Sequence, residues 1–215
     1  AVHGGDRAIS EGFIKKWPPI DEVDRTMVLA SLEGDNHAFG PNCEAFESEF
    51  AAWNGNRFAI TTNSGTAALH MALVACDVGC GDEVIVPPYT FISTVTSVLM
   101  VGAVPVFADI NPQSYCLDPD DVPGRIGPNT RAIMPVHLAG HMADMPRLKE
   151  IAESNHLALI EDCAQAIDAG LNNKKAGTWG DLGTFSFQSN KTLTCGEGGL
   201  ILTNDSQLAE KVVAL

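Results

Sequence analysis

From residue 57 onward, the sequence alternates short apolar or β-branched runs with segments of helical spacing. The predicted strands are residues 58–61, 83–86, 104–109, 132–136, 158–162, 184–187 and 200–203. The predicted helices are residues 66–76, 91–101, 145–155 and 206–215. Apolar strand runs of this kind are typical of a sheet that helices cover on both faces. The sequence therefore predicts an α/β fold, with a mostly parallel seven-stranded sheet between helices.

The first 56 residues differ in character and are expected to form an N-terminal helical segment. Residues 1–19 read as irregular, and residues 20–32 have helical spacing. After a loop, Asn42 is expected to cap a second helix that runs through Trp53. The α/β domain is then predicted to cover residues 57–215. Because the last predicted helix is still in progress where the sequence stops, we expect the chain to be a piece of a longer protein.

Charge excludes several classes of partner. The 215 residues contain 13 Lys and Arg against 27 Asp and Glu, which gives a formal net charge of -14. Such an acidic chain is not expected to bind nucleic acid or an anionic membrane through general electrostatics. A phosphorylated small ligand is still compatible, because a helix N-terminus binds phosphate without basic residues.

The cysteine pattern bears on metal content and on location. None of the six cysteines forms a C-x-x-C pair, and no histidine accompanies them at zinc-finger spacing. We therefore expect no metal and reduced thiols, as in a cytoplasmic protein. The sequence also has no signal peptide and no apolar run of membrane-spanning length.

One lysine, Lys191, occupies an unusual place in the polar loop between the last two predicted strands. An ammonium group is costly to bury unless it is paired or loses its charge. One way for it to lose the charge is a Schiff base between the amine and an aldehyde. The alternative is a solvated lysine on a hairpin loop, which is the usual environment of lysine.

The loop after the first predicted strand offers a place for an anion. Ser64, Gly65 and Thr66 follow this strand and open a helix. Gly65 permits close approach of a ligand, while free N–H groups of the first turn and the two hydroxyls can bind phosphate. The alternative is an ordinary helix cap. In the next strand-to-helix turn, Phe91 either stacks on a flat ring or packs at the start of its helix.

Two further loops carry polar residues at strand ends. Asp162 ends the strand 158–162, and Gln165 lies three residues later. A carboxylate at this place can accept a charge-assisted hydrogen bond from a pyridinium N–H, although a helix cap or an ion pair would also explain it. His137 follows the fourth strand and is expected to line the cleft; the alternative is a hydrogen-bonded histidine near the core.

These loops are expected to meet, because parallel sheets bind ligands beyond the carboxyl ends of their strands. Together they supply a phosphate site, a cover for a ring, a carboxylate for a ring nitrogen and an amine for an aldehyde. Pyridoxal 5′-phosphate has a group for each of these contacts. Each motif is weak alone, and their order and placement favour this cofactor.

Several segments resemble one known family. They are N-S-G-T-A-A-L at 63–69, G-D-E-V-I-V-P-P-Y-T-F at 81–91, P-V-H-L-A-G at 135–140, I-E-D-C-A-Q-A at 160–166 and S-F-Q-S-N-K-T-L-T-C-G-E-G-G at 186–199. The residues look like those of the DegT/StrS family of sugar and cyclitol aminotransferases, which are fold-type-I pyridoxal phosphate enzymes. The resemblance covers nearly the whole chain, and the last two segments are specific. It implies that residues 57–215 form the large cofactor-binding domain.

The resemblance also implies roles for individual residues. Lys191 forms the Schiff base and moves the proton, and Asp162 pairs with the ring nitrogen. The other expected cofactor contacts are Ser64, Gly65, Thr66 and Ser186 at the phosphate, Phe91 over the ring and Gln165 at the ring hydroxyl. Family members are homodimers with shared active sites. The partner's phosphate-binding asparagine and a small C-terminal domain would lie past Leu215.

Substrate contacts are expected from His137 and Gln188. Gln188 stands where many sugar-nucleotide members have histidine, and L-A-G at 138–140 replaces the more usual L-Y-G. Both features are similar to the branch that acts on cyclitol ketones or makes aminohydroxybenzoate.

The predicted function is transfer of an amino group from glutamine or glutamate to a nucleotide-linked keto sugar or a keto cyclitol. One alternative is a dehydratase or an aminohydroxybenzoate-synthase-like enzyme that keeps the cofactor. In the related dehydratases a histidine replaces the lysine, so Lys191 favours the aminotransferase. The other alternative is a regulatory protein that keeps the fold without catalysis, and the presence of both Lys191 and Asp162 argues against it.

Overall fold

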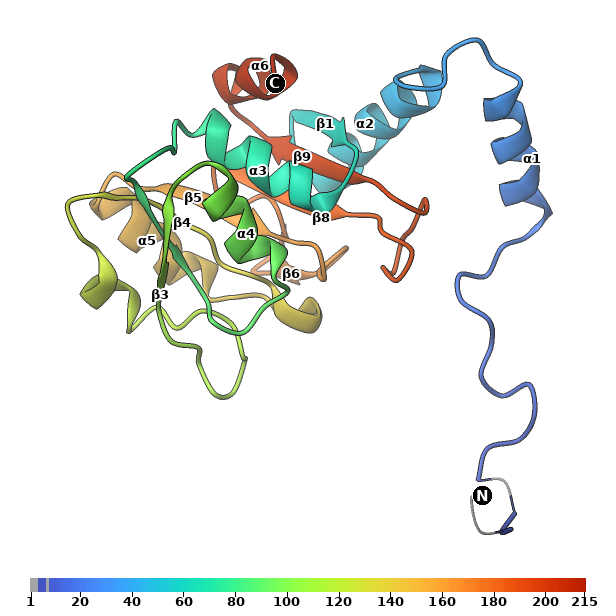
Figure 1. Cartoon of the computed structure of the whole chain (residues 1–215), viewed down its shortest axis with the longest axis horizontal. Coiled ribbons are helices and arrows are strands. Elements are labelled where there is room, and N and C mark those ends of the chain that lie inside the picture. The colour runs from blue at the N-terminus through green and yellow to red at the C-terminus, as the bar shows by residue number, and fades with distance from the viewer. Residues whose placement is uncertain (1–3, 7) are drawn as a thin grey trace. The chain divides into compact units, whose positions relative to one another are not determined.

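The computed structural model describes residues 4–6 and 8–215, and the chain divides into two compact units, Ala1–Gly40 and Pro41–Leu215 (Figure 1). The first unit contains helix α1 (Glu22–Leu32). The Asp21 carboxylate accepts the N–H groups of Val23 and Asp24 at 2.8 and 3.1 Å, and Asp24 accepts the N–H of Asp21 in return. This capping box explains where α1 begins. None of the described residues of α1 is buried.

The second unit is built on one sheet. Its described strands are β1 (Phe58–Thr62), β2 (Glu83–Val86), β3 (Val104–Phe107), β4 (Thr130–Ile133), β5 (Ala158–Asp162), β8 (Leu182–Ser186) and β9 (Gly199–Thr203). They lie in the order β1, β9, β8, β5, β4, β2, β3. All neighbours from β8 to β3 are parallel, whereas β9 is antiparallel to both β1 and β8. The prediction of an α/β fold with a mostly parallel seven-stranded sheet is therefore confirmed.

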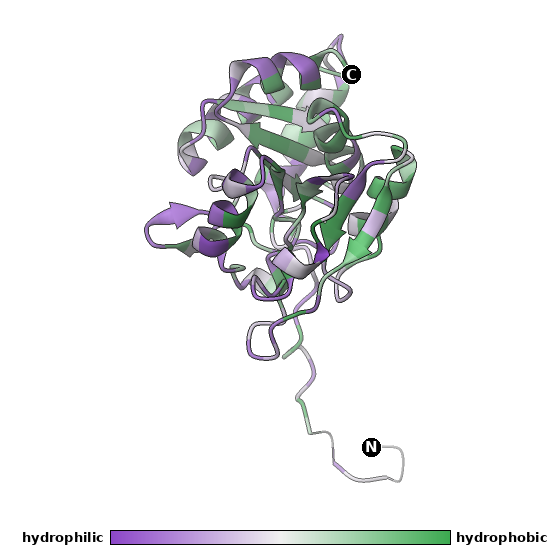
Figure 2. Ribbon diagram, turned by 90° about the vertical axis from the view of Figure 1, so that its left-hand side faces the viewer, coloured by the Kyte–Doolittle hydropathy of each residue, from purple (hydrophilic) through white to green (hydrophobic). Residues whose placement is uncertain are grey.

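Helices cover both faces of this sheet (Figure 1). The helices are α2 (Pro41–Asn54) and α5 (Met145–Ser154) on one face, and α3 (Gly65–Ala75), α4 (Ser93–Met100) and α6 (Ser206–Val213) on the other. Strand residues alternate between the two cores: Ile85 packs into the first, and its neighbours Val84 and Val86 pack into the second. Figure 2 shows the hydrophobic residues concentrated in the strands between the helices.

Aromatic contacts attach α2 to the sheet. The ring of Phe46 lies 5.2 Å from that of Phe187, and the ring of Phe50 lies 5.3 Å from that of Phe185. The sequence predicted a domain boundary at residue 57, but these contacts group α2 with the sheet, and the compact unit begins at Pro41. The predicted cap at Asn42 is wrong as well, because α2 already begins at Pro41, where proline suits the first helical turn.

Other differences from the prediction concern strands. Strand β4 ends at Ile133, whereas the prediction extended it to 136. Pro135 lacks an N–H, and only one isolated bridge, between Val136 and Asp162, continues the pairing. The hairpin of β6 (Gly170–Leu171) and β7 (Lys174–Lys175) was not predicted, since its strands have two residues each.

Among the described residues, no helix combines the length and the apolar character needed to cross a bilayer.

Candidate active site

A cleft lies where the loops after the parallel strands meet the N-terminal ends of α3 and α4. Its volume is about 330 Å³, within the range of sites for small ligands. The lining residues are Ser64, Gly65, Thr66, Leu69, Phe91, Ser93, Asp162, Ala164, Gln165, Ser186, Gln188, Asn190, Lys191 and Glu197. The cleft thus brings together all the predicted site residues except His137.

The end of α3 forms one wall of the cleft. Ser64 caps the helix, with its hydroxyl accepting the N–H of Ala67 at 3.1 Å. Gly65 and Thr66 are the first helical residues, whose N–H groups have no partner within the helix. A Cβ on Gly65 would lie 2.7 Å from the Cβ of Ser186, so only glycine lets α3 approach β8 this closely. These groups can hold an anion, and the hydroxyl of Thr66 is 2.7 Å from that of Ser93.

Asp162 lies at the carboxyl end of β5 and is 4% exposed. Its Oδ2 accepts the hydroxyl hydrogen of Thr94 at 2.8 Å, and its Oδ1 accepts the N–H of Ala164 at 3.1 Å. Burial raises the pKa of Asp162, while these two hydrogen bonds and the charge of the nearby Lys191 oppose that rise. A carboxylate has about four acceptor positions, so Asp162 keeps capacity for a donor inside the cleft.

Lys191 lies on the loop between β8 and β9 and is half-buried. Its backbone N–H donates to the carbonyl of Gln188 at 2.8 Å, which forms a tight turn. Lys191 lines the cleft with Asp162, and its charge opposes the rise in the pKa of that carboxyl group. It also borders a second hollow of about 320 Å³, whose other walls include Ala139, Ile167 and Leu193.

The remaining predicted residues take different positions. Phe91 is 65% exposed at the cleft, so one ring face is free to cover a ligand. The side-chain oxygen of Gln165 accepts the N–H of Ala139 at 2.9 Å, which leaves its NH₂ group as a donor. The side chain of Gln188 bonds within its own loop, to Ser189 and Asn190 at 2.9 Å each.

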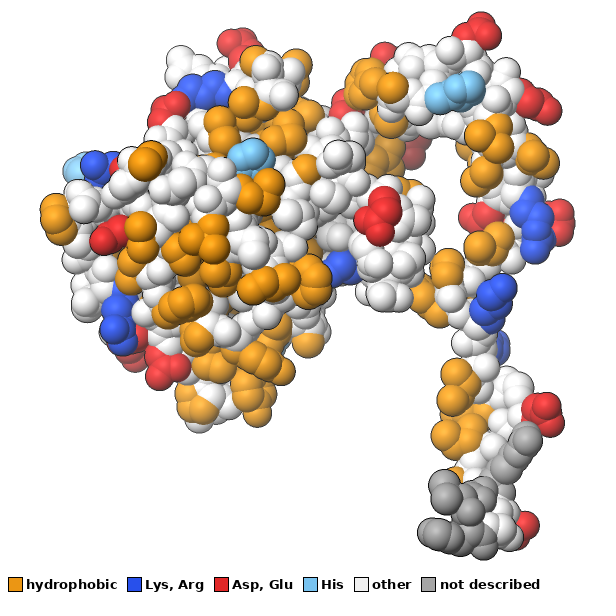
Figure 3. Space-filling model, in the orientation of Figure 1, with side chains coloured by type: hydrophobic (Ala, Val, Ile, Leu, Met, Phe, Trp, Pro, Cys, Tyr) orange, Lys and Arg blue, Asp and Glu red, His pale blue; other side chains and the backbone are white. Residues whose placement is uncertain are grey.

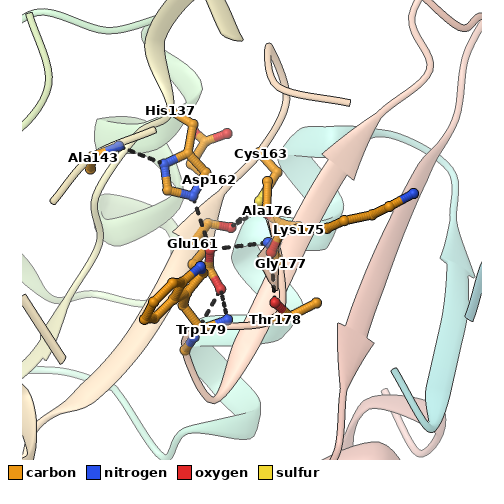
Figure 4. A network of polar contacts seen from close by, with 12 residues as sticks. His137, Ala143, Glu161, Asp162, Cys163, Lys175, Ala176, Gly177, Thr178 and Trp179 are labelled. Atoms are coloured by element: carbon orange, nitrogen blue, oxygen red, sulfur yellow. Dashed lines mark hydrogen bonds and ion pairs between the residues drawn. The ribbon is translucent and has the colours of Figure 1, made fainter. Parts of the chain in front are cut away.

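His137 does not line the cleft, and that prediction is wrong. Its side chain is fully buried behind the sheet edge and contacts Glu161 (Figure 4). Nδ1 accepts the N–H of Ala143 at 3.2 Å, so the ring carries its proton on Nε2 and donates it to Glu161 at 2.9 Å. The hydrogen-bonded core histidine, the alternative reading of the sequence, is the one observed.

Glu161 was not predicted to have a role, and it organises the loop behind the site. Its Oε1 accepts the N–H groups of Trp179 and Gly180 at 2.7 and 2.8 Å, and its Oε2 accepts those of Gly177 and His137 at 3.0 and 2.9 Å. Figure 4 shows this network around the carboxylate. A buried carboxylate with four donors needs no further partner. Neighbouring acids on β5 thus differ: Glu161 is saturated, and Asp162 remains open to the cleft.

One group of possible metal donors lies together in the described part of the chain, formed by His137, Glu161 and Cys163. The four acceptor positions of Glu161 and the Nδ1 of His137 are already occupied by N–H groups. Only the buried thiol of Cys163 is left, and burial raises its pKa, so it is not available as a thiolate. This set therefore does not fit a metal ion.

The donor set of the cleft does fit pyridoxal phosphate. An anion site at the end of α3, an aromatic ring, an open buried carboxylate and an amine face one space. The sequence model of the DegT/DnrJ/EryC1/StrS aminotransferase family matches residues 18–215. The chain belongs to this family.

Members of the family with established names are similar over most of the chain. GDP-perosamine synthase of Caulobacter vibrioides is 45% identical over 196 residues, which are 91% of this chain and 53% of the relative. L-glutamine:2-deoxy-scyllo-inosose aminotransferase of Streptomyces kanamyceticus is 49% identical over 167 residues, 78% of this chain and 39% of the relative. The chain thus spans about half the length of these DegT/DnrJ/EryC1/StrS relatives, or less.

A solved structure supports the fold assignment. NtdA of Bacillus subtilis, solved with bound cofactor PMP, superposes with a TM-score of 0.80 at 38% identity, covering 87% of this chain and 42% of that one. Together with the sheet order, this shows that the second unit has the fold found in the fold-type-I pyridoxal phosphate enzymes.

Sequence reasoning missed several residues at this cleft. Leu69, Ser93, Ala164, Asn190 and Glu197 line it as well, and Thr94 bonds to Asp162 from α4. Ser93 and Thr94 could have been found from the sequence, because they follow Phe91 at the start of a predicted helix, and such helix starts lie at the carboxyl ends of the strands.

Proposed function

We propose that the protein is a pyridoxal phosphate-dependent aminotransferase that moves an amino group from glutamate or glutamine to the carbonyl carbon of a keto sugar or keto cyclitol. The observation that carries this proposal is the cleft in which Lys191 and Asp162 meet beside the open end of α3. When bound, pyridoxal phosphate supplies an aldehyde and an aromatic ring that withdraws electrons from the carbon next to the nitrogen.

The residues of the cleft divide the binding of this cofactor among them. The N–H groups at Gly65 and Thr66 and the hydroxyl of Ser186 bind the phosphate, with Ser64 fixing the helix end. Phe91 covers the ring. These contacts use backbone donors and hydroxyls, which suits a chain with a formal net charge of -14.

Asp162 and Lys191 act on the reacting part of the cofactor. Asp162 would accept the hydrogen of the ring nitrogen and so favour the protonated, electron-withdrawing form of the ring. Gln165 donates to the ring hydroxyl through its free NH₂ group. Lys191 would provide the amine that holds the cofactor aldehyde, and the same amine would be placed to move a proton at the donor carbon.

The substrate class follows from the relatives and from Gln188. One relative is named for a nucleotide-linked sugar, and the other for glutamine and a deoxyinosose, a cyclitol ketone. We infer a keto sugar or keto cyclitol acceptor with a glutamine or glutamate donor. Gln188 reaches the cleft with a neutral amide, which can bind a hydroxyl group of either acceptor.

The partner in assembly is a second copy of the chain. The face that carries α4 and the edge strand β3 gathers hydrophobic side chains (Figure 3). The exposed ones include Phe91, Ile92, Leu99, Met100, Val104 and Phe107. Exposed apolar patches of this kind mark protein interfaces. A homodimer formed here would close the cleft beside Phe91, and the mass of the protein in solution, from light scattering, tests it.

The decisive experiment follows the amino group. The protein with added pyridoxal phosphate should show visible absorbance of the bound cofactor, lose it on addition of glutamine or glutamate, and regain it with a keto sugar or keto cyclitol. Lys191→Ala should lower the turnover by on the order of 10³-fold or more, because it removes both the amine and the proton carrier. The matched control is Lys149→Ala, since Lys149 lies away from the cleft and donates to the Trp179 carbonyl.

Three results would contradict the proposal. They are an unchanged cofactor spectrum in Lys191→Ala, loss of water from the substrate in place of amino transfer, and binding of the cofactor without any response to amino donors.

A further inference from the structure

Thr94 holds a position that the proposed catalytic roles do not use. It lies on α4, is fully buried, and does not line the cleft. Its hydroxyl nevertheless contacts Asp162, 2.8 Å from Oδ2, and the hydroxyl of Thr90 lies 2.8 Å on its other side. Two hydroxyls and a carboxylate therefore form a continuous line from the turn before α4 to the end of β5.

The direction of these hydrogen bonds is fixed by the chemistry of the end group. A carboxylate only accepts, so Thr94 gives its single hydrogen to Asp162. The oxygen of Thr94 is then the acceptor for the hydroxyl of Thr90. Hydrogen bonds that share one direction polarise and strengthen each other in a buried site.

The surroundings explain why Asp162 needs such a donor. Burial disfavours its charge, and the hydrogen bond from Thr94 is the largest of the influences that favour it. The other charged or titratable groups around it are Lys191 from the loop after β8, His137 from the loop after β4, and Cys163 on its own strand end. Within the described residues, only the hydroxyl of Thr94 and the N–H of Ala164 donate to the carboxylate of Asp162.

We propose that Thr94 is a positioning residue, supported by Thr90, that keeps Asp162 charged and its carboxylate directed at the cleft. The effect of Thr94 on catalysis rests on the proposed function, in which a charged Asp162 binds the ring nitrogen of the cofactor. The chain of hydroxyls itself is a property of the protein without cofactor.

The first test therefore uses the protein without cofactor. Because the pKa of Asp162 is raised on folding, stability is highest below the pKa that this carboxyl group has in the unfolded chain and is lost as the pH rises through its pKa in the folded protein. Thr94→Val removes a donor to the charged form and raises this pKa further. Its urea midpoint should fall more at pH 8 than at pH 5, and Thr94→Ser should restore the wild-type profile.

The matched control is Ser97→Ala, which removes another buried hydroxyl from α4. Ser97 bonds to the backbone carbonyl of Thr94 and not to Asp162, so its effect should be the same at both pH values. Thr90→Val should change the pH dependence of the urea midpoint in the same direction as Thr94→Val, but by less. If Thr94→Val does not fold, Thr90→Val provides the test. Equal losses at pH 5 and pH 8 in both threonine variants would overturn the proposal.

The second test measures the affinity for pyridoxal phosphate. Thr94→Val should weaken binding roughly tenfold, the size expected for a hydrogen bond to a charged group, while Ser97→Ala stays close to wild type. If the wild type binds no pyridoxal phosphate, the proposed function fails, while the pH profile still decides the role of Thr94. If Thr94→Val binds the cofactor as the wild type does, the positioning role fails and the function stands.

Discussion

The two walls of the cleft hold their reactive groups in different ways. Asp162 lies on a buried strand end, with hydrogen bonds to α4 and to its own loop. Lys191 lies on a loop whose polar contacts are largely local, such as those of Gln188 with Ser189 and Asn190. Segments with few buried contacts open at a lower free energy than core strands. The acid is thus fixed before a ligand arrives, while the amine lies on the more adaptable wall.

This difference suits the proposed chemistry. The acid has one task, to hold a ring nitrogen, and a fixed position serves it. In the proposed function the amine would both hold the cofactor and carry a proton, which requires the Lys191 side chain to change partners. Mutations that act on one wall and not on the other can test this contrast.

The largest difference is expected between two glutamates. Glu161→Ala on the fixed wall should lower the free energy of unfolding by about 3 kcal/mol, because it leaves His137 and three backbone N–H groups without their acceptor. Glu197→Ala on the loop wall should change it by less than about 0.5 kcal/mol, since Glu197 is exposed. Urea unfolding measures both. Similar losses in the two variants would show that the walls are not held differently.

A smaller loss is expected from the contact between α3 and β8. In Gly65→Ala the new Cβ would meet Ser186, 2.7 Å from its Cβ and 3.3 Å from its Cα, and backbone on both sides prevents easy relief. We expect a loss of about 2 kcal/mol, as for other overpacked sites. Gly79→Ala is the control, because nothing lies within 4 Å of a Cβ at Gly79. If both glycine variants unfold at the same urea concentration, the close packing of α3 on β8 at Gly65 does not contribute to stability.

The same contrast explains what the sequence predicted well. Asp162 and Lys191 follow strands whose apolar runs are readable, and the carboxyl ends of parallel strands meet at one edge. Their presence in one cleft could therefore be predicted from the sequence alone. The local pattern also indicated Ser64 as the cap of α3, because serine before a helix is a common cap.

Contacts between distant segments could not be predicted in this way. Glu161 and Asp162 are neighbouring acids at the end of the same strand, and no local pattern separates them. Glu161 is saturated by the backbone of residues 177–180, and backbone donors leave no trace in the sequence. His137 was placed in the cleft for a related reason: its position after a strand was readable, but its partner Glu161 was not.

The smallest expected difference in the free energy of unfolding is between variants of two serines, one on each wall of the cleft. Ser64→Ala should cost about 1 kcal/mol, because Ser64 caps α3 through the N–H of Ala67. Ser189→Ala should cost less than about 0.5 kcal/mol, since Ser189 is exposed and its one side-chain hydrogen bond within the described part of the chain is to the flexible side chain of Gln188. Urea unfolding under identical conditions gives the free energy of unfolding of each variant. The comparison uses the difference between the two variants, which does not depend on the absolute stability of the wild type. If Ser189→Ala lowers the free energy of unfolding as much as Ser64→Ala does, local hydrogen bonds hold the Lys191 loop as firmly as a cap holds α3. The adaptability would then belong to the Lys191 side chain and not to its loop.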